Sequence, residues 1–480
     1  MVEAPNRRTK VIATLGPASS DEQTLRAMID AGMDCVRINM SHGKLDDGLQ
    51  LYHRVRALSA DAGRPVGTLV DLPGPKVRAG SFGADSVMLE EGHRLRLTPG
   101  NRASTAEVVE VNYEELLTHV EDGDTLSFGD GAIDCRIVGR DGGSLLAEIT
   151  HGGRLSGRPG VHIPSDRLHV ATPTREDLQI LDAFVEAGVD MVAVSFVRSA
   201  HDVRRVGTEP HPRGPLVVAK IETRAAVQNL EGIIDAAGAI MIARGDLGNE
   251  CSIEELPHLQ KHIIRMCIAQ GRPTITATQM LESMVYAATP TRAEASDVAN
   301  AVFDGSSAVM LSGETAIGHD PANVVRTMAR LAARADANFD YNGWARQLVE
   351  LHMNEPSALD RKVTDALTMA AARVARDLRC TAIMCITRSG FTARAMARFR
   401  PDAKILAFSP DERTINQLTL SWGAVPLPLT QFASNDEMVA EAVAVAKAQG
   451  HIRAGDVVAV LAGTGAHSRA TDVLRVVNVS

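Results

Sequence analysis

The sequence predicts an α/β protein: a (β/α)8 barrel of the TIM type, interrupted by a small β-barrel lid domain and followed by a C-terminal three-layer α/β domain. Eight short apolar strands, each followed by room for a helix, predict the main barrel. A Gly- and Asp-rich stretch of short alternating strands after the third of them predicts the insertion. The alternative, an open doubly wound sheet, would place a G-x-G-x-x-G turn after its first strand, and the sequence has none there.

Three strands precede the insertion. The pattern predicts them at Lys10–Leu15, Cys35–Asn39 and Val66–Asp71, with helices at Leu25–Ala31 and Asp46–Ala62. A Ser-Ser-Asp run at 19–21 marks the first helix start, because such side chains accept hydrogen bonds from a helix's free N–H groups. The stiff turn Pro73-Gly74-Pro75 then ends this alternation of strands and helices.

The segment Ser81–Ile163 reads as all-β. Its clearest strands are predicted at His93–Leu97, Thr125–Phe128, Ile133–Val138 and Leu145–Ile149. The strand–helix rhythm returns with a helix at Thr174–Ala187 and closes with a helix from Pro321 to about Asp336. Between them, strands are predicted at Met191–Phe196, Leu216–Ile221, Ala239–Ala243, Thr274–Thr278 and Ala308–Leu311.

The C-terminal part alternates helices and strands again. Helices are predicted at Val363–Leu378, Ala393–Phe399, Arg413–Leu420 and Asn435–Gln449, and strands at Ala382–Thr387, Lys404–Phe408, Ala424–Pro428, Val457–Leu461 and Val473–Val477. The predicted domains are therefore residues 1–72 and 172–345 for the barrel, 73–171 for the lid and 346–480 for the C-terminal domain.

Composition excludes several classes of function. The chain has 480 residues, 45% hydrophobic and 23% charged, which is typical of a globular protein with several cores. A formal net charge of −9 and only 3% aromatic residues argue against nucleic-acid binding. We expect no membrane partner, because we find no spanning apolar run and no secretion signal at Met1–Lys10. Six cysteines without a C-x-x-C pair fit a reduced, cytoplasmic protein.

The stretch Val217–Glu250 carries the first candidate site. It contains two apolar strands joined by a helix, and their ends bear Lys220, Glu222, Arg244 and Asp246. Lys220 and Glu222 are two residues apart and share one face of a strand. Two carboxylates and an ammonium on one rim suit a divalent metal and a phosphoryl group. The alternative is a surface loop with ordinary ion pairs.

Polar residues also follow other strands of the predicted barrel. After the second strand, Arg37, Asn39 and Ser41 alternate, and His42 follows. Arg37 suits a phosphate, although it could instead pair with a neighbouring carboxylate. The third, seventh and eighth strands run into Asp71–Arg78, Ala277–Glu282 and Leu311–Thr315. Polar groups at the same end of so many strands indicate a functional barrel mouth.

Longer strings give a family resemblance. TKVIATLGPASS, VRINMSHG, GPKVRAG, MVAVSFVRSA, AKIE, IMIARGDLG, ATQMLESM, PTRAEASDVANAVFDG and VMLSGETA resemble pyruvate kinase, in the family's order, from Arg8 to about Ala335. The resemblance implies phosphoryl transfer from phosphoenolpyruvate to ADP, giving pyruvate and ATP in the last step of glycolysis. It also implies Mg²⁺ (or Mn²⁺) as cofactor and a homotetramer.

The resemblance assigns a role to each matching residue. Glu222 and Asp246 would bind the metal, Lys220 would stabilise charge on the phosphoryl group, and Arg37 would hold its oxygens. The backbone N–H groups of Gly245 and Asp246 would receive the substrate carboxylate. Thr278 would lie near the enolate carbon as a candidate in proton delivery. Asn39, His42 and Arg78 would lie on the nucleotide side.

One departure from the family pattern concerns potassium. Many relatives read Asp-Thr-Lys-Gly-Pro-Glu after the third strand and bind K⁺ with residues matching Asn39, Ser41 and Asp71. Here Leu72 replaces Thr and Lys76 replaces Glu. A Lys ammonium can supply the charge of a monovalent cation. We therefore expect Lys76 to act in catalysis and K⁺ not to be required; the alternative is that Lys76 points to solvent and K⁺ still binds.

Smaller features complete the interpretation. The lid would close over the nucleotide and exclude water. Arg158 precedes the string Gly-Val-His-Ile-Pro and is a candidate nucleotide contact, whereas Asn249-Glu250-Cys251 has no explanation from the sequence. In the C-terminal domain the loop residues Thr387, Arg388, Ser389, Gly390 and Thr392 predict a site for a sugar phosphate or nucleotide effector. A helix start without a ligand is the alternative.

Two other functional classes explain the sequence less well. A catalytically weakened paralogue that senses metabolites or binds a partner should have lost Lys220, Glu222, Asp246 or Thr278, and all are present. A metal-dependent aldolase built on a barrel would have no reason for a nucleotide lid. The active kinase is the better interpretation.

Overall fold

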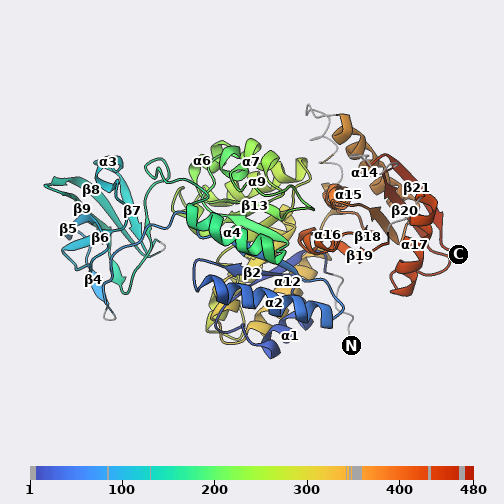
Figure 1. The fold of residues 1–480 in the computed structure, drawn as a ribbon, viewed down its shortest axis with the longest axis horizontal. Helices are drawn as coiled ribbons and strands as arrows, with labels where there is room; N and C mark the ends of the chain where they lie inside the picture. The colour runs from blue at the N-terminus through green and yellow to red at the C-terminus, as the bar shows by residue number, and fades with distance from the viewer. Residues whose placement is uncertain are drawn as a thin grey trace.

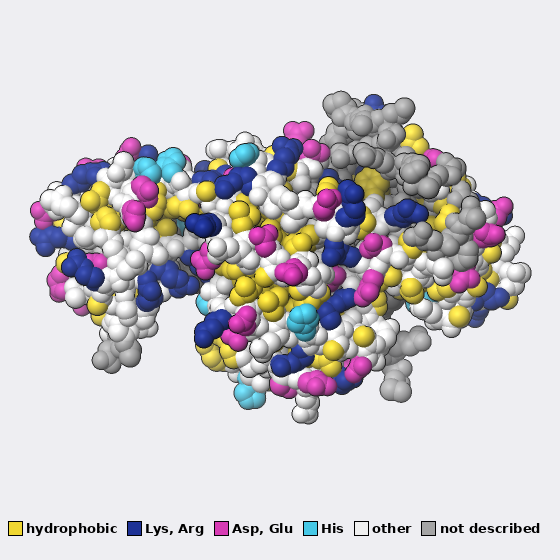
Figure 2. Space-filling view, in the orientation of Figure 1, with side chains coloured by type: hydrophobic (Ala, Val, Ile, Leu, Met, Phe, Trp, Pro, Cys, Tyr) yellow, Lys and Arg dark blue, Asp and Glu magenta, His cyan; other side chains and the backbone are white. Residues whose placement is uncertain are grey.

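Three parts of the chain follow one another along the long axis of the molecule: the lid, the barrel and the C-terminal domain (Figure 1). The computed structural model describes residues 7–83, 86–129, 131–341, 343–344, 348, 359–430, 434–463 and 471–480. The predicted boundary at 345/346 lies outside these ranges. On the face drawn in Figure 2, basic and acidic side chains are interspersed and the lid stands out as a lobe of its own. Within the described ranges, no helix has the length and apolar character needed to cross a bilayer.

Eight parallel strands close into a ring, which confirms the predicted fold class. In ring order they are β1 (Lys10–Leu15), β16 (Ala308–Leu311), β15 (Thr274–Ala277), β14 (Ala239–Ala243), β13 (Leu216–Ile221), β12 (Met191–Val194), β3 (Gly67–Asp71) and β2 (Cys35–Asn39). Buried side chains such as Leu69, Met191 and Met241 fill the core inside the ring, as alternation along parallel strands requires. Leu420 of the C-terminal domain joins the same cluster.

Helices surround the ring and begin where the sequence supplies caps. They are α1 (Glu22–Asp30), α2 (Leu45–Asp61), α4 (Arg175–Ala187), α5 (Ala200–Arg204), α6 (Arg224–Gln228), α7 (Leu230–Ala236), α8 (Arg244–Gly248), α9 (Leu256–Ala269), η1 (Glu282–Val285), α10 (Arg292–Asp304), α11 (Gly313–Ala316) and α12 (Pro321–Asp336). Asp21 caps α1, Thr174 caps α4, and Thr291 with Glu294 forms a capping box on α10.

Two barrel strands end earlier than the sequence predicts. β12 stops at Val194 rather than Phe196, and β15 stops at Ala277 rather than Thr278. In both places the backbone turns to positive φ, 54° at Phe196 and 66° at Thr278, which no strand can continue. Both turns lie at the mouth of the barrel.

The lid is built on a six-stranded sheet whose two edges are linked by one short segment. Its elements are β4 (Val87–Leu89), β5 (Arg94–Pro99), β6 (Val108–Val111), α3 (Leu116–His119), β7 (Thr125–Phe128), β8 (Ile133–Asp141), β9 (Ser144–His151), β10 (Gly153–Leu155) and β11 (Val161–His162). Six strands pair in the order β11-β7-β8-β9-β5-β6, while β10 pairs with β4. Arg78 bridges to Gly160 beside β11, and Ala79 bridges to Val111 on β6, so this short segment joins the two edges.

The C-terminal domain has three layers. Its elements are α14 (Leu359–Asp377), β17 (Ala382–Ile386), α15 (Phe391–Ala397), β18 (Lys404–Ser409), α16 (Glu412–Gln417), η2 (Leu418–Leu420), β19 (Ala424–Pro428), α17 (Asn435–Ala448), β20 (Val457–Ala462) and β21 (Val473–Asn478). The sheet order is β19-β18-β17-β20-β21, with β21 antiparallel. Ile383 and Ile405 pack with α14 and α15, whereas Met384 and Leu406 pack with α17, because successive side chains point to opposite faces.

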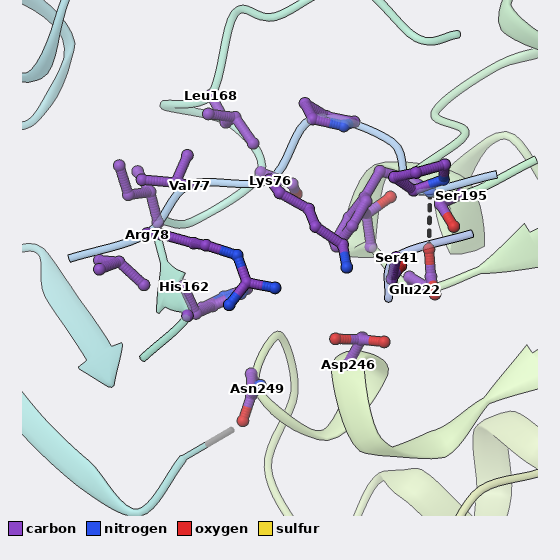
Figure 3. Close-up of a pocket in the computed structure, with 18 of the residues that line it drawn as sticks. Ser41, Lys76, Val77, Arg78, His162, Leu168, Ser195, Glu222, Asp246 and Asn249 are labelled. Carbon is purple, nitrogen blue, oxygen red and sulfur yellow. Dashed lines mark hydrogen bonds between the residues drawn. The ribbon is translucent and has the colours of Figure 1, made fainter. Parts of the chain in front are cut away.

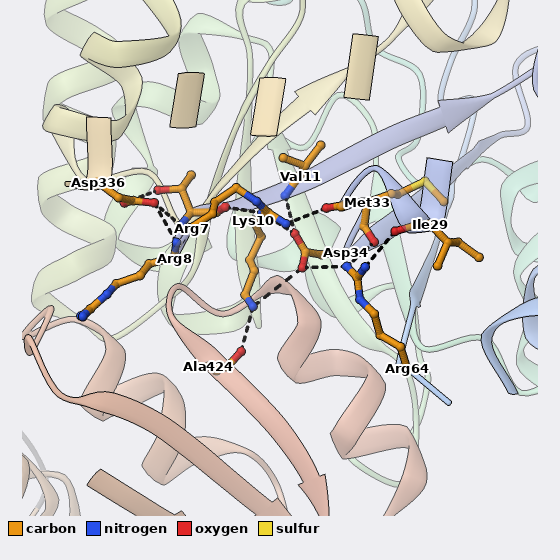
Figure 4. Close-up of polar contacts among 12 residues, drawn as sticks. Arg7, Arg8, Lys10, Val11, Ile29, Met33, Asp34, Arg64, Asp336 and Ala424 are labelled. Atoms are coloured by element: carbon orange, nitrogen blue, oxygen red, sulfur yellow. Dashed lines mark hydrogen bonds and ion pairs between the residues drawn. The ribbon is translucent and has the colours of Figure 1, made fainter. Parts of the chain in front are cut away.

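Polar contacts attach the N-terminal side of the barrel to the C-terminal domain (Figure 4). Asp34 accepts from the Val11 N–H at 2.8 Å and from Arg7 Nη1 at 2.6 Å. Lys10 Nζ lies 3.9 Å from Asp34 Oδ1 and donates to the carbonyl of Ala424 at 2.8 Å. Burial would raise the pKa of Asp34, but Arg7 and Lys10 outweigh burial and lower it.

Asp336 is the second anchor of this interface. It is 2% exposed and accepts from the backbone N–H groups of Arg8 and Thr9, both at 2.8 Å. The Thr9 hydroxyl donates to it at 2.9 Å and the indole N–H of Trp422 at 3.3 Å. One buried carboxylate therefore holds the start of β1 and the C-terminal domain together.

Replacing Asp336 tests this anchor. Asp336→Ala leaves four donors, three of them buried, without their acceptor, and we expect the first unfolding transition in urea to lose roughly 3 kcal/mol. The exposed Asp30→Ala is the control and should change that free energy by less than about 0.5 kcal/mol. Equal effects of the two substitutions would contradict the anchoring role.

Candidate active site

A cavity of about 520 Å³ lies at the mouth of the barrel, between the barrel and the lid (Figure 3). Its wall includes the ends of β2, β12 and β13, helix α8, the segment 73–78 and the returning lid strand. The sequence-predicted residues in this wall are Arg37, Asn39, Ser41, His42, Lys76, Arg78, Arg158, Lys220, Glu222 and Asp246, and the unexplained Asn249 and Glu250 line it too. A concave, polar site of this size accommodates a small ligand.

Lys220 is a buried cation of this site. It is 7% exposed, and its Nζ lies 2.7 Å from Glu222 Oε1 and 3.4 Å from Asp71 Oδ1. The ammonium also donates to Ser195 Oγ at 2.7 Å. Burial lowers the pKa of Lys220, but Asp71 and Glu222 outweigh burial, so the net pKa is raised and the ammonium stays charged.

Arg37 both pairs with a carboxylate and lines the cavity. Its Nε donates to Asp71 Oδ2 at 2.6 Å and its Nη1 to Thr14 Oγ1 at 3.1 Å, so it pairs with a carboxylate. It also lines the cavity. Burial would raise the pKa of Asp71, but Lys220 and Arg37 outweigh burial and lower it. Asp71 is thus an anion that fixes two cations.

Glu222 is fully buried, and only one of its two carboxylate oxygens accepts a well-directed hydrogen bond from the described residues. Its Oε2 accepts from the Phe196 N–H at 2.6 Å. Its Oε1 lies beside Lys220 but accepts no well-directed hydrogen bond from the described residues. Burial raises the pKa of Glu222, and Asp246 raises it further, because a second carboxylate nearby disfavours its charge.

These two carboxylates fit a hard divalent cation, which favours oxygen ligands and relieves like-charge repulsion. Across the described part of the chain, no three His, Cys, Asp or Glu side chains are arranged to hold a metal. The protein would therefore supply two carboxylates, and water or substrate oxygens would supply the remaining ligands.

Backbone strain gathers at the same mouth. Of the non-glycine residues with positive φ, Phe196, Thr278 and Gln279 all lie directly after barrel strands. A β-branched Thr rarely adopts this conformation and needs support from its surroundings. Arg244 gives that support: it donates to the carbonyl of Thr278 at 2.7 Å and pairs with Asp297 at 2.8 Å.

Several predicted site residues do not face the cavity. Thr278 Oγ1 accepts from the Gly245 N–H at 2.9 Å, so this N–H already has a partner, and neither residue is in the cavity wall. Asp71 lies behind Arg37 and Lys220. Leu72 is 1% exposed and packs in the hydrophobic core, because its position after β3 points outward from the ring.

Lys76 reaches into the cavity from the turn after β3 (Figure 3). This turn packs tightly on the end of β12: a Cβ on Gly74, at φ 70°, would come within 2.8 Å of Ser195 Cβ. Burial is the main cause that lowers the pKa of Lys76, and the positive charges of Arg78 and Lys220 add to it. The net pKa is about 8. Lys76 thus lies in the cavity wall, whereas the alternative interpretation of the sequence had its side chain point to solvent.

The predicted effector loop lies between β17 and α15. Gly390 has φ 77°, as its left-handed turn requires. Thr387 and Thr392 are 8% and 6% exposed, and the Thr392 hydroxyl is 2.7 Å from that of Thr471. Arg388 is exposed. The loop therefore presents fewer hydroxyls to solvent than its sequence suggests.

Sequence reasoning missed two groups at the mouth. Ser195 continues the inward alternation of Met191 and Ala193 and meets Lys220, so the strand period could have identified it. His162 lines the cavity 3.2 Å from Glu250, and only the fold brings these two together.

Comparisons with known proteins agree with this architecture. The sequence model described as "Pyruvate kinase, barrel domain" matches residues 6–325, and "Pyruvate kinase, alpha/beta domain" matches residues 365–477. The pyruvate kinase of Clostridium acetobutylicum is 35% identical over 98% of this chain and 99% of the relative. That of Corynebacterium glutamicum is 38% identical over 96% and 94%. A crystal structure of a pyruvate kinase from Cryptosporidium parvum superposes with a TM-score of 0.90 at 30% identity, covering 99% of this chain and 96% of the other.

The support that Arg244 gives to Thr278 is testable. Arg244→Lys removes the planar fork, so the strained turn should relax, and we expect kcat for phosphoenolpyruvate-dependent ATP formation to fall about tenfold or more. The KM for phosphoenolpyruvate should change much less. The exposed Arg265→Lys is the matched control, and an Arg244→Lys enzyme as fast as that control would refute the role.

Proposed function

The chain belongs to the pyruvate kinase family, and we propose that the residues at its barrel mouth transfer the phosphoryl group of phosphoenolpyruvate to ADP, with Lys76 in place of a potassium ion. The observation that carries the proposal is the buried set of Lys220, Glu222 and Asp71, with Asp246 in the wall of the same cavity. Phosphoryl transfer needs positioned positive charge more than a covalent nucleophile. Lys220 supplies positive charge here, and the carboxylates fix it in place.

The proposed roles follow from the contacts. The phosphoryl group leaves the enol oxygen of phosphoenolpyruvate and bonds to a β-phosphate oxygen of ADP; the enolate then takes a proton at its terminal carbon and becomes pyruvate. Lys220 and Arg37, both fixed by Asp71, stabilise the negative charge on the phosphoryl oxygens. Glu222 and Asp246 would hold Mg²⁺ or Mn²⁺, which would supply further positive charge to the transfer.

Thr278 remains the proposed participant in proton delivery. Its hydroxyl lies next to Gly245, and a water between this hydroxyl and the substrate would complete the path. Because the Gly245 N–H already donates to Thr278, we propose that the backbone N–H of Asp246, rather than that of Gly245, binds the substrate carboxylate. Asn39, His42, Arg78 and Arg158 form the proposed nucleotide side of the cavity.

Potassium independence is supported by where Lys76 lies. Its side chain is in the cavity wall, whereas Leu72 at the preceding altered position is in the core. An ammonium there offers a fixed positive charge and three donors. Asn39 Oδ1 accepts from the Ser41 N–H at 3.1 Å, so this side chain is engaged in its own turn.

Allostery, a tetramer and a cytoplasmic location stay predictions from the family. We propose that an anionic effector, a sugar phosphate or nucleotide, contacts the loop through Arg388, Ser389 and Gly390. The carbonyl of Ser389 accepts from Arg394 Nη2 at 2.7 Å, which holds the loop in shape. The weakened-paralogue alternative is not favoured, because Lys220, Glu222 and Asp246 all lie in the cavity wall.

The role of Lys76 can be tested with a coupled assay in tetraalkylammonium buffer free of Na⁺ and K⁺. The wild type should be fully active there, whereas Lys76→Met should lose about 10- to 100-fold in kcat and recover most of it with added K⁺. Lys76→Arg keeps the charge and serves as the control. Because the pKa of Lys76 is about 8, the wild-type rate without K⁺ should fall as the pH rises through 8 and the ammonium is lost.

A strong activation of the wild type by K⁺ at pH 7 would refute this role. Absence of any turnover with phosphoenolpyruvate, ADP and Mg²⁺, with or without K⁺, would refute the proposed function as a whole.

A further inference from the structure

Glu250 is a buried carboxylate at the joint between lid and barrel. Its side chain is 5% exposed. Oε1 accepts from the Ser165 N–H at 2.9 Å and lies 3.2 Å from His162 Nε2. Oε2 accepts from the Ser165 hydroxyl at 2.6 Å and from the Arg224 N–H at 3.1 Å. Four donors from two domains therefore meet on one side chain.

These contacts tie together three pieces of the active site. Ser165 and His162 belong to the chain returning from the lid, where β11 ends. Arg224 begins α6, two residues after Glu222, and its Nε also donates to the carbonyl of Glu250 at 3.1 Å. Glu250 itself follows α8, which bears Asp246. The lid is thus joined directly to the two segments that carry the proposed metal ligands.

The charge of Glu250 suits this joint. Burial works to raise its pKa, but the hydrogen bonds from His162, Ser165 and the Arg224 N–H outweigh burial, and the pKa is lowered. The carboxylate is therefore ionised at neutral pH, and charge-assisted hydrogen bonds are the stronger kind. Moving the lid away would leave a buried anion without its partners, which is costly.

The other contacts that the structure describes between lid and barrel either lie at the hinge of the lid or involve no buried charged side chain. Arg198 donates to the carbonyls of Leu168 and Val170, both at 3.0 Å, at the hinge itself. A Cβ on Gly131, in the turn between β7 and β8, would come within 2.9 Å of Asn249 Oδ1, so that turn also rests on the barrel. Among these contacts, only those of Glu250 hold β11 beside the cavity with a buried charge.

We propose that Glu250 is a positioning residue for the nucleotide half of the reaction: it latches the returning lid strand to the barrel and holds the ring of His162 in the wall of the nucleotide cleft. The inference rests on the proposed function in placing the nucleotide on this side of the cavity. It also gives the segment Asn249-Glu250-Cys251 the role that the sequence did not reveal.

The ring of His162 is oriented by this contact. A carboxylate can only accept, so His162 Nε2 carries the proton and Nδ1 is left as the acceptor of the neutral ring. His162 shares the cavity wall with Arg78 (Figure 3), and Arg158 lines the same cavity. Two guanidinium donors and one imidazole acceptor suit a ligand with phosphates and hydroxyl groups, as a nucleoside diphosphate has.

Glu250→Gln tests the latch, because it keeps the shape of the side chain and removes its charge. We expect the KM for ADP to rise at least about fivefold and the KM for phosphoenolpyruvate to change less than about twofold, since the reacting atoms are not touched. Hydrogen exchange should accelerate at the Ser165 amide and its neighbours, and not in the barrel strands. Ser165→Ala should act in the same direction, and the double variant should be less than additive.

Glu255→Gln is the matched control. Glu255 pairs with the same Arg224, at 3.3 Å, but is half exposed, and its hydrogen bonds among the described residues go to Arg224 and Ser252 of the barrel. A Glu250→Gln enzyme with the exchange pattern and the two KM values of this control would overturn the proposal, as would equal rises in both KM values. The exchange measurement needs no turnover, so it tests the latch separately from the proposed function.

Discussion

The active site depends on one buried ammonium. Lys220 is held by two carboxylates: Glu222, just after its own strand β13, at 2.7 Å, and Asp71, at the end of β3, at 3.4 Å. Ring closure makes this possible: Asp71 pairs in register with Ala193, and Val194 with Ala219, so β3, β12 and β13 present their ends together. Removing any member leaves an uncompensated buried charge. The charge set and the closed barrel therefore depend on each other.

The surrounding loops turn this charge set into a shaped cavity. Phe196 and Thr278 adopt strained turns, and both are held by hydrogen bonds to the site, through Glu222 and Arg244. Glu250 connects the lid to these loops through its hydrogen bonds to Ser165 and Arg224. Strain of this kind persists only where neighbouring contacts fix it, and here those contacts come from residues proposed to act in the site. Positioning and stability thus use the same side chains.

Most of the fold could be predicted from the sequence, because apolar strands of fixed length and capped helices carry local signals. The rest needed tertiary contacts. Nothing local shows that Leu72 points into the core while Lys76 reaches the cavity, or that Thr278 occupies the Gly245 N–H. Glu250 was unexplained because its partners, His162 and Ser165, lie some eighty residues away in the lid. A polar side chain gains its role from where the fold places it.

The most direct test of the central claim is the turnover number of folded Lys220→Met at saturating phosphoenolpyruvate, ADP and Mg²⁺. If the buried ammonium stabilises the phosphoryl group in transfer, kcat should fall by roughly three orders of magnitude. A fall of less than about tenfold would contradict the account, because charge at this position would then contribute little to the reaction.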